Sequence, residues 1–110
     1  MKQGDIYDVY FDPTQGSEQR GRRPAIILSG TAINLFMHTV IVVPLTTSLK
    51  NYHENLILKP TNENGLSKVS EALPIHIRAI DRKRLKKKLG NISVSEIATL
   101  KGSLDRILKY

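Results

Sequence analysis

Residues 5–29 read DIYDVYFDPTQGSEQRGRRPAIILS and contain two expected strands joined by a long polar loop. In residues 5–11, Tyr7, Val9 and Phe11 fall at alternate positions, which predicts a strand with these three side chains on one face. Residues 25–29 are apolar up to the final serine and predict a second, buried strand. The polar loop between them, residues 12–24, is long for a small domain, so it is either functional or disordered.

Short apolar runs farther along predict more strands. Residues 38–44 are nearly continuous in apolar side chains and indicate a third strand, which we expect to end or bulge at Pro44 because proline cannot donate to a ladder. Residues 53–58 predict a fourth strand, and residues 68–80 predict one or two more, interrupted by Pro74.

Turns and helices fill the remaining segments. Residues 31–36 are expected to form one short helical turn, and Asn64-Gly65 is a turn signal. Near the C-terminus, Ser93 followed by Glu96 predicts a capping box. The apolar residues that follow it share helical spacing: Ile97, Leu100, Leu104, Ile107 and Leu108. Several short strands with one firm helix predict a mostly β fold, a small antiparallel sheet or barrel with the C-terminal helix packed on it.

The composition limits the class of protein. The chain has 110 residues, which we expect to form a single domain, residues 1–110. Its formal net charge of +7 favours an anionic partner, with nucleic acid first and an anionic membrane surface second. Cysteine is absent, which excludes disulfides and thiolate chemistry. No apolar run is long enough to span a bilayer. We therefore expect the protein to be cytoplasmic and not to associate with a membrane.

The loop before the second strand is the densest polar segment. Arg20, Arg22 and Arg23 offer planar guanidinium groups that suit phosphate recognition, beside glycines that allow close backbone approach. A solvated loop is the alternative interpretation. Arg23 is the best single candidate, because Pro24 fixes the backbone next to it.

Two further places carry candidate site residues. Thr46 and Thr47 follow a buried strand, where a hydroxyl can bind a phosphate oxygen, although threonine also simply suits a strand end. Alternation in residues 75–78 places His76 and Arg78 on one face. Histidine is the natural acid–base candidate near neutral pH, but any one histidine is more often structural.

Residues 82–88 carry six cations in seven positions, among them Lys86 and Lys87. Such a run is usually a solvated face, but with the loop arginines it also suggests an electrostatic footprint for a polyanion. Tyr10, Phe36 and Tyr52 are candidates for stacking on bases, with a place in the core as the alternative for Phe36. Histidines and carboxylates are scattered without metal-ligand spacing, so we expect no metal and no cofactor.

Three motifs resemble the MazF/PemK (Kid)-like toxins of bacterial toxin–antitoxin systems. The opening GDIY followed by DPTQGSEQRGRRPA, residues 4–7 and 12–25, is similar to the start of that family. VVPLTT at residues 42–47 and IRAID at residues 77–81 are similar to two later motifs. Order and spacing agree over essentially the whole chain, and the first motif is specific.

The resemblance implies a small SH3-like β-barrel of the CcdB/Kid type, acting as a homodimer and neutralised by a cognate MazE/PemI-like antitoxin. It implies a metal-independent endoribonuclease, an mRNA interferase that cuts single-stranded RNA (mRNA) at short sequences. Arg23 and Thr46 correspond to the catalytic pair, and Glu18, Gln19 and Arg78 to residues that line the RNA groove. Ile75 and His76 replace an acidic residue and a glutamine seen in some relatives.

Cleavage without metal requires the RNA's own 2′-OH to attack the neighbouring phosphorus. We expect Arg23 to stabilise the charge that develops there. Glu18 and His76 are the side chains whose type suits proton transfer, and the sequence leaves the general base and acid unassigned between them and Arg23. Two alternatives remain: a CcdB-like protein that binds gyrase, and a non-catalytic nucleic-acid-binding barrel.

Overall fold

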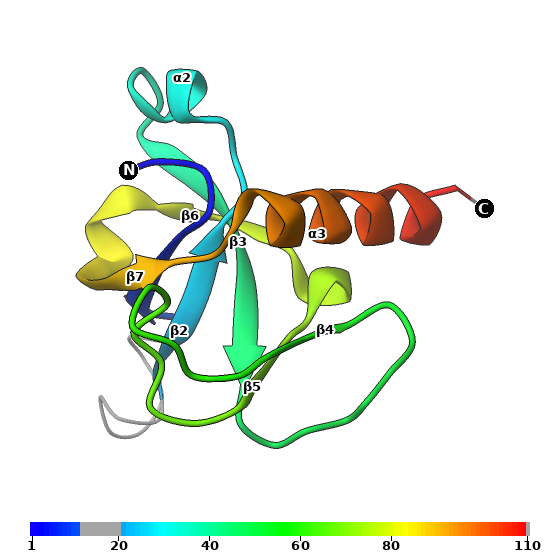
Figure 1. The fold of residues 1–110 in the computed structure, drawn as a ribbon. Helices are drawn as coiled ribbons and strands as arrows, with labels where there is room; N and C mark the ends of the chain where they lie inside the picture. Colours follow the sequence, from blue (N-terminus) through cyan, green and yellow to red (C-terminus); the bar gives the residue numbers. More distant parts are fainter. Residues whose placement is uncertain (12–20, 110) are drawn as a thin grey trace.

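The computed structural model describes residues 1–11 and 21–109, and its strands form a curled, fully antiparallel sheet (Figure 1). The main path runs β4-β5-β3-β2-β1-β7, and β6 pairs with β3 beside this path. The strands are β1 (Asp5–Tyr10), β2 (Arg22–Ile27), β3 (Thr39–Thr46), β4 (Leu56–Leu58), β5 (Ser70–Ala72), β6 (Arg78–Asp81) and β7 (Leu85–Asn91). The helices are α2 (Thr31–Asn34), η1 (Pro74–His76), η2 (Arg82–Arg84) and α3 (Val94–Ile107). The expected class, mostly β with a C-terminal helix, is confirmed.

Strand β3 lies at the centre and changes partner along its length. One edge pairs with β2, while the other pairs first with β6 and then, from Leu45, with β5. Pro44 lies at this change, and its carbonyl accepts a hydrogen bond from the Leu73 N–H at 3.0 Å. In a strand the N–H and C=O of one residue point to the same side. The missing N–H of Pro44 therefore faces the gap between β6 and β5, so the prediction that the strand ends or bulges at Pro44 is wrong.

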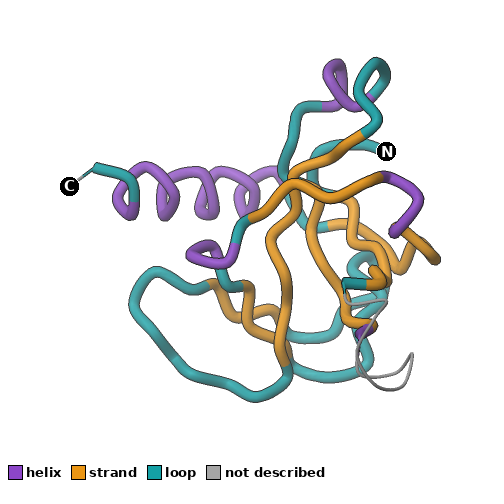
Figure 2. The backbone as a smooth tube through the Cα atoms, turned by 180° about the vertical axis from the view of Figure 1, so that it is seen from behind, coloured by secondary structure: helices purple, strands orange, loops and turns teal. Residues whose placement is uncertain are grey.

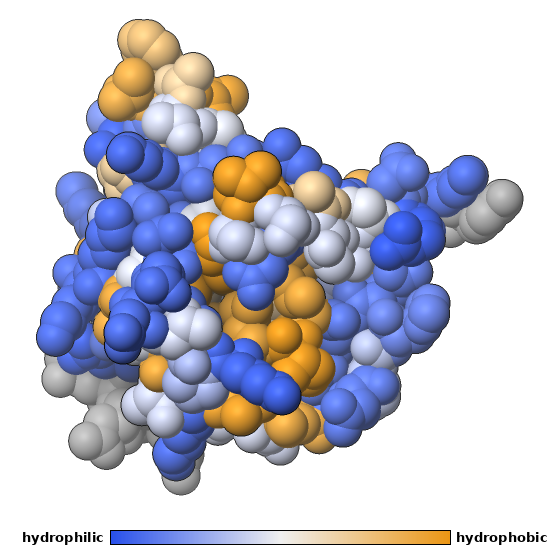
Figure 3. Space-filling view, in the orientation of Figure 1, coloured by the Kyte–Doolittle hydropathy of each residue, from blue (hydrophilic) through white to orange (hydrophobic). Residues whose placement is uncertain are grey.

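The sheet buries apolar side chains on both faces, which explains the continuous apolar runs of β2 and β3. Neighbouring residues alternate between two core clusters: Ile26 and Val43 belong to one, Ile27 and Val42 to the other. Helix α3 covers the first cluster with Leu100, which is fully buried. In Figure 3, apolar side chains gather below this helix.

Strand β7 pairs with β1 and was not expected from the sequence. Its residues 86–88 are three consecutive exposed lysines, so the alternation that identifies a half-buried strand is absent. The β1–β7 register shifts twice, between Ile6 and Tyr7 and between Asp8 and Val9. Such irregularities increase strand twist, which bends this edge of the sheet toward a half-barrel.

The C-terminal helix has the predicted capping box. The Ser93 Oγ accepts from the Glu96 N–H at 3.1 Å, and the Glu96 carboxylate accepts from the Ser93 N–H at 2.8 Å. Leu108 was expected on the apolar face, but it is the C-cap residue and 78% of its surface is exposed. Ile97, Leu100 and Leu104 pack in or against the first core cluster, so the apolar periodicity of the sequence continues beyond the last helix residue of that cluster. Figure 2 shows the helix from behind, extending past the sheet.

Other boundaries differ by a few residues. β2 begins at Arg22 rather than at residue 25, because Arg22 and Arg23 pair with Tyr10 and Val9 of β1. β4 covers Leu56–Leu58, a part of the expected 53–58. The helical turn near residue 31, the Asn64-Gly65 turn and the interruption at Pro74 are confirmed.

Candidate functional site

Two surface hollows adjoin at Arg23. The first has a volume of about 380 Å³ and is lined by Phe11, Gly21, Arg23, Pro44, Leu73, His76 and Arg78. The second is lined by Arg22, Arg23, Pro24, Leu45, Thr46, Thr47 and Ser70. Arg23 is exposed and lines both, so a ligand that runs from one hollow into the other would contact this residue.

The strand pairing explains how Arg23 reaches this position. Arg23 pairs with Val9 of β1, whereas the pairing of β2 with β3 begins two residues later, at Ala25 and Pro44. The start of β2 therefore diverges from β3 and leaves a gap beside Arg23. The sequence places this arginine at the junction of loop and strand, and the structure makes it the second residue of β2.

Thr46 lies across the same gap as the last residue of β3. Its Oγ1 accepts a hydrogen bond from the Ser48 N–H at 3.1 Å. A hydroxyl that accepts from the backbone still has its own hydrogen to donate. Thr46 can therefore donate to an oxygen anion in the second hollow, and the neighbouring Thr47 lines that hollow as well.

The first hollow brings together His76, Arg78 and Phe11. The Arg78 Cζ lies 5.3 Å from the centre of the Phe11 ring, a cation–π distance. The expected strand alternation over residues 75–78 is wrong for its first half, because Pro74–His76 form a 3-10 turn and Arg78 begins β6. His76 and Arg78 nevertheless face the same hollow, as predicted.

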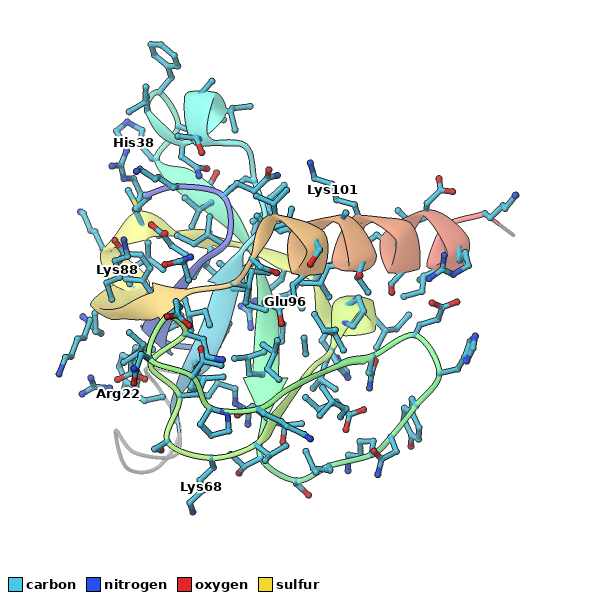
Figure 4. All side chains as sticks on the ribbon, viewed as in Figure 1. Arg22, His38, Lys68, Lys88, Glu96 and Lys101 are labelled. Carbon is cyan, nitrogen blue, oxygen red and sulfur yellow. The ribbon has the colours of Figure 1, made fainter. Side chains whose placement is uncertain are left out.

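Other predicted RNA contacts have different surroundings. The Arg22 guanidinium makes an ion pair with Asp8, at 2.6 Å from Nη2 and 3.0 Å from Nε to the same oxygen. Arg22 therefore reaches the second hollow with much of its charge already paired. Lys86 and Lys87 are exposed on β7, and of the described residues that line the two hollows none comes from that strand. Figure 4 shows Arg22 and Lys88 on the same side of the molecule.

Glu18, Gln19 and Arg20 lie outside the described residues. Of the aromatic candidates for stacking, Tyr52 and Phe36 are exposed, so the alternative core position for Phe36 is wrong. Within residues 1–11 and 21–109, no three His, Asp or Glu side chains gather closely enough to hold a metal ion. None of the helices in that part of the chain is long and apolar enough to cross a membrane.

Sequence reasoning did not single out Glu71, the strand partner of Thr46. Its side chain is fully buried, and its carboxylate accepts hydrogen bonds from the segment that follows Thr47. A lone carboxylate between small residues in a short apolar stretch is the signal that could have indicated it, since a buried charge needs partners.

The arrangement as a whole suits an anionic chain with exposed bases. Arg23, Arg78 and the Thr46 hydroxyl are donors that can bind phosphate oxygens. The Phe11 ring adds an apolar surface to the first hollow.

Comparison with known proteins gives one consistent result. The family model described as PemK-like, MazF-like toxin of type II toxin–antitoxin system matches residues 2–108. Endoribonuclease MazF9 of Mycobacterium tuberculosis is 32% identical, over 94% of this chain and 92% of its own length. The crystal structure of MazF (Form-I) from Deinococcus radiodurans is 31% identical with a TM-score of 0.81, covering 100% of this chain and 97% of that one. A MazE-MazF structure from the same organism is 28% identical with a TM-score of 0.78, covering 100% and 97%.

Proposed function

Since this chain belongs to the PemK-like, MazF-like toxins of type II toxin–antitoxin systems, we propose that it is an endoribonuclease toxin that cuts single-stranded RNA at short sequences. The position of Arg23 carries this proposal. Arg23 lines both hollows, together with Thr46 of β3 in one and His76 in the other. A scissile phosphate held there has donors on both sides, and its flanking nucleotides extend into the two hollows.

The proposed reaction needs no metal. The 2′-oxygen of the RNA attacks the adjacent phosphorus while the bond from phosphorus to the 5′-oxygen breaks. The 2′-OH loses its proton to a base, and the leaving 5′-oxygen gains one from an acid. The products are a 2′,3′-cyclic phosphate and a 5′-OH, so atoms and charge balance without water. Arg23 and Thr46 donate to the phosphorane oxygens, where negative charge develops.

Proton transfer falls to side chains that titrate nearer neutral pH than arginine does. His76 lines the same hollow as Arg23 and is the proposed carrier within the described residues. Glu18 is the second proposed proton carrier, and this proposal rests on its place in the sequence motif alone. Arg78 and Thr47 are proposed to hold flanking phosphates, with Gln19, Arg20 and Arg22 on the neighbouring segment.

The proposed partners follow from charge and relatives. A net charge of +7 favours an acidic antitoxin as well as RNA, and a Deinococcus relative is seen as a MazE-MazF complex. We infer a cognate MazE/PemI-like antitoxin that competes with RNA for this surface. A homodimer in the cytoplasm, where mRNA is available, completes the proposal.

The test is cleavage of a long mixed-sequence RNA by the purified protein in excess EDTA, with cut sites and end groups mapped. Arg23→Ala should lower kcat by about 100-fold or more, because it removes a fixed donor to the transition state. Arg23→Lys keeps the charge and loses the paired geometry, so it should remain strongly impaired. Lys101→Ala, an exposed cation on α3 (Figure 4), is the matched control.

Discrete cuts with cyclic-phosphate and 5′-OH ends that disappear in Arg23→Ala support the proposal. Intact RNA at high protein concentration would reject it in favour of a non-catalytic binder, and a gyrase assay would then test the CcdB-like alternative. Equal turnover by Arg23→Ala and Lys101→Ala would reject Arg23 as a catalytic residue.

A further inference from the structure

The segment between β3 and β4 is organised around one buried charge. The Glu71 carboxylate accepts hydrogen bonds from the backbone N–H groups of Lys50, Asn51 and Tyr52, the last two at 3.0 and 3.2 Å. The Asn55 side-chain amide donates a fourth bond at 2.6 Å. Glu71 itself has no exposed surface. A single carboxylate thus holds residues 48–55, called here the 48–55 loop.

The backbone of the loop is shaped to surround this carboxylate. Asn51 has a φ of 57°, in the left-handed region that asparagine adopts more readily than most residues. Successive N–H groups beside such a residue converge to form a concave anion-binding nest. Burial alone raises the pKa of Glu71, but the hydrogen bonds from Asn51, Asn55, Lys50 and Tyr52 together bring it below its ordinary value. The nest is therefore occupied by an ionised group of the protein itself.

The 48–55 loop begins directly at the proposed catalytic site. Thr46 is the strand partner of Glu71, and the N–H of Ser48 donates to the Thr46 hydroxyl oxygen. Figure 1 shows the loop leaving the end of β3 in a wide curve before it returns into β4. The residue that holds the loop from inside is thus also the cross-strand neighbour of Thr46.

A second contact holds the loop from outside. The Arg106 guanidinium on α3 makes a two-pronged ion pair with Glu54, with N–O distances of 2.9 and 3.0 Å. Between the two anchors the Tyr52 side chain is 67% exposed. The loop continues directly from Thr47, which lines the second hollow. A large aromatic ring exposed on a fixed backbone is an arrangement that proteins use to stack single-stranded bases.

We propose that Glu71 is a positioning residue that holds the 48–55 loop in one conformation, so that Tyr52 stacks on a nucleotide flanking the scissile phosphate. This inference rests on the proposed endoribonuclease function. A preformed loop does not have to be ordered when RNA binds, so more of the stacking energy appears as affinity. We therefore expect substitution of Glu71 to weaken RNA binding, and we expect this effect to act through Tyr52.

The experiment is a double-mutant cycle on an RNA that contains a mapped cut site. Tyr52→Ala should raise KM about tenfold with kcat within about threefold, because one base loses its stacking partner. Tyr52→Phe keeps the ring and should retain the wild-type KM. Glu71→Gln should raise KM by a similar factor, and the double variant should be no worse than Glu71→Gln alone. Glu63→Gln, an exposed site with the same change of charge, is the control.

Backbone amide exchange separates positioning from general destabilisation. Glu71→Gln should accelerate exchange at Lys50, Asn51 and Tyr52 by a larger factor than in α3, where only the loss of global stability acts. Tyr52→Ala should leave these amides protected. If Glu71→Gln does not fold, Asn55→Ala removes one bond to the same carboxylate and should give a smaller increase in KM.

Additive effects of the two substitutions, or an unchanged KM in Tyr52→Ala, would overturn the inference while leaving the proposed function intact. A wild-type protein that cuts no RNA would instead show that the proposed function has failed, and the positioning role would fall with it.

Discussion

The 48–55 loop and strand β7 use charge in opposite ways. The loop is organised by one carboxylate, Glu71, that is fully buried and accepts four hydrogen bonds. Strand β7 carries three consecutive lysines, and all three are exposed. The Lys88 Nζ lies 3.4 Å from the Asp5 Oδ1. The run of lysines makes β7 conspicuous in the sequence, whereas the fold depends far more on the single buried charge of Glu71 that organises the loop.

The difference follows from solvation. A buried charge must be compensated by specific donors, so its position determines the backbone around it. An exposed lysine is compensated by water and can be exchanged at little cost to stability. What β7 contributes to the fold comes instead from its backbone, from Leu85 and Leu89, which pack against the two core clusters, and from Gly90, which packs against the 63–64 turn.

The largest expected effect is in β7 itself, at Gly90. A Cβ at this position would lie 2.2 Å from the Glu63 carbonyl oxygen and 2.5 Å from the Asn64 carbonyl carbon. Both are backbone atoms that no rotamer change can move, so Gly90→Ala should lower the free energy of unfolding by about 3 kcal/mol. Chemical denaturation measures this. A variant as stable as the wild type would mean that β7 does not pack on the 63–64 turn.

The second effect concerns Glu71 and depends on pH. Its folded-state pKa lies below the ordinary value of 4.5, so the ionised form stabilises the fold above that value. This stabilisation should be lost as the pH falls through the folded-state pKa. At neutral pH, Glu71→Gln should cost about 2–3 kcal/mol. Denaturation at several pH values should show a decline in acid for the wild type and a smaller one for Glu71→Gln. If the free energy of unfolding falls equally with decreasing pH in both proteins, ionised Glu71 does not stabilise the loop.

The smallest effect on stability is expected for Lys86→Gln with Lys87→Gln. Unfolding should change by no more than about 0.5 kcal/mol, because both side chains are exposed. If these lysines lie near RNA phosphates, the slope of log affinity against log salt should fall by about 0.7 per lost contact. Binding titrations over a salt series test this. An unchanged slope would leave the lysine run as a solvated face.

Features set by neighbours in sequence were predictable. The capping box of α3, the Asn64-Gly65 turn and the strand before Thr46 depend on interactions within a few residues. Arg23 and Thr46 were identified from motif and position, and they do line one hollow. Their catalytic roles stay predictions.

Features that depend on distant partners were not predictable. Strand β7 exists because β1 offers it an edge, and its own residues show no strand alternation. Arg22 was grouped with Arg23 as an RNA contact, yet pairing across to β1 places it against Asp8. Pro44 interrupts no ladder because β3 changes partner there.

The sequence by itself determined the kind of molecule: a small basic, mostly β domain with a capped C-terminal helix and an arginine and a threonine at strand ends. Local propensity, alternation and capping depend on residues close in sequence, so they can be predicted from the sequence alone. The tertiary structure decided which charges matter. It buried Glu71, paired Arg22 and left Arg23 between two hollows, because register and burial depend on strands that meet only after folding.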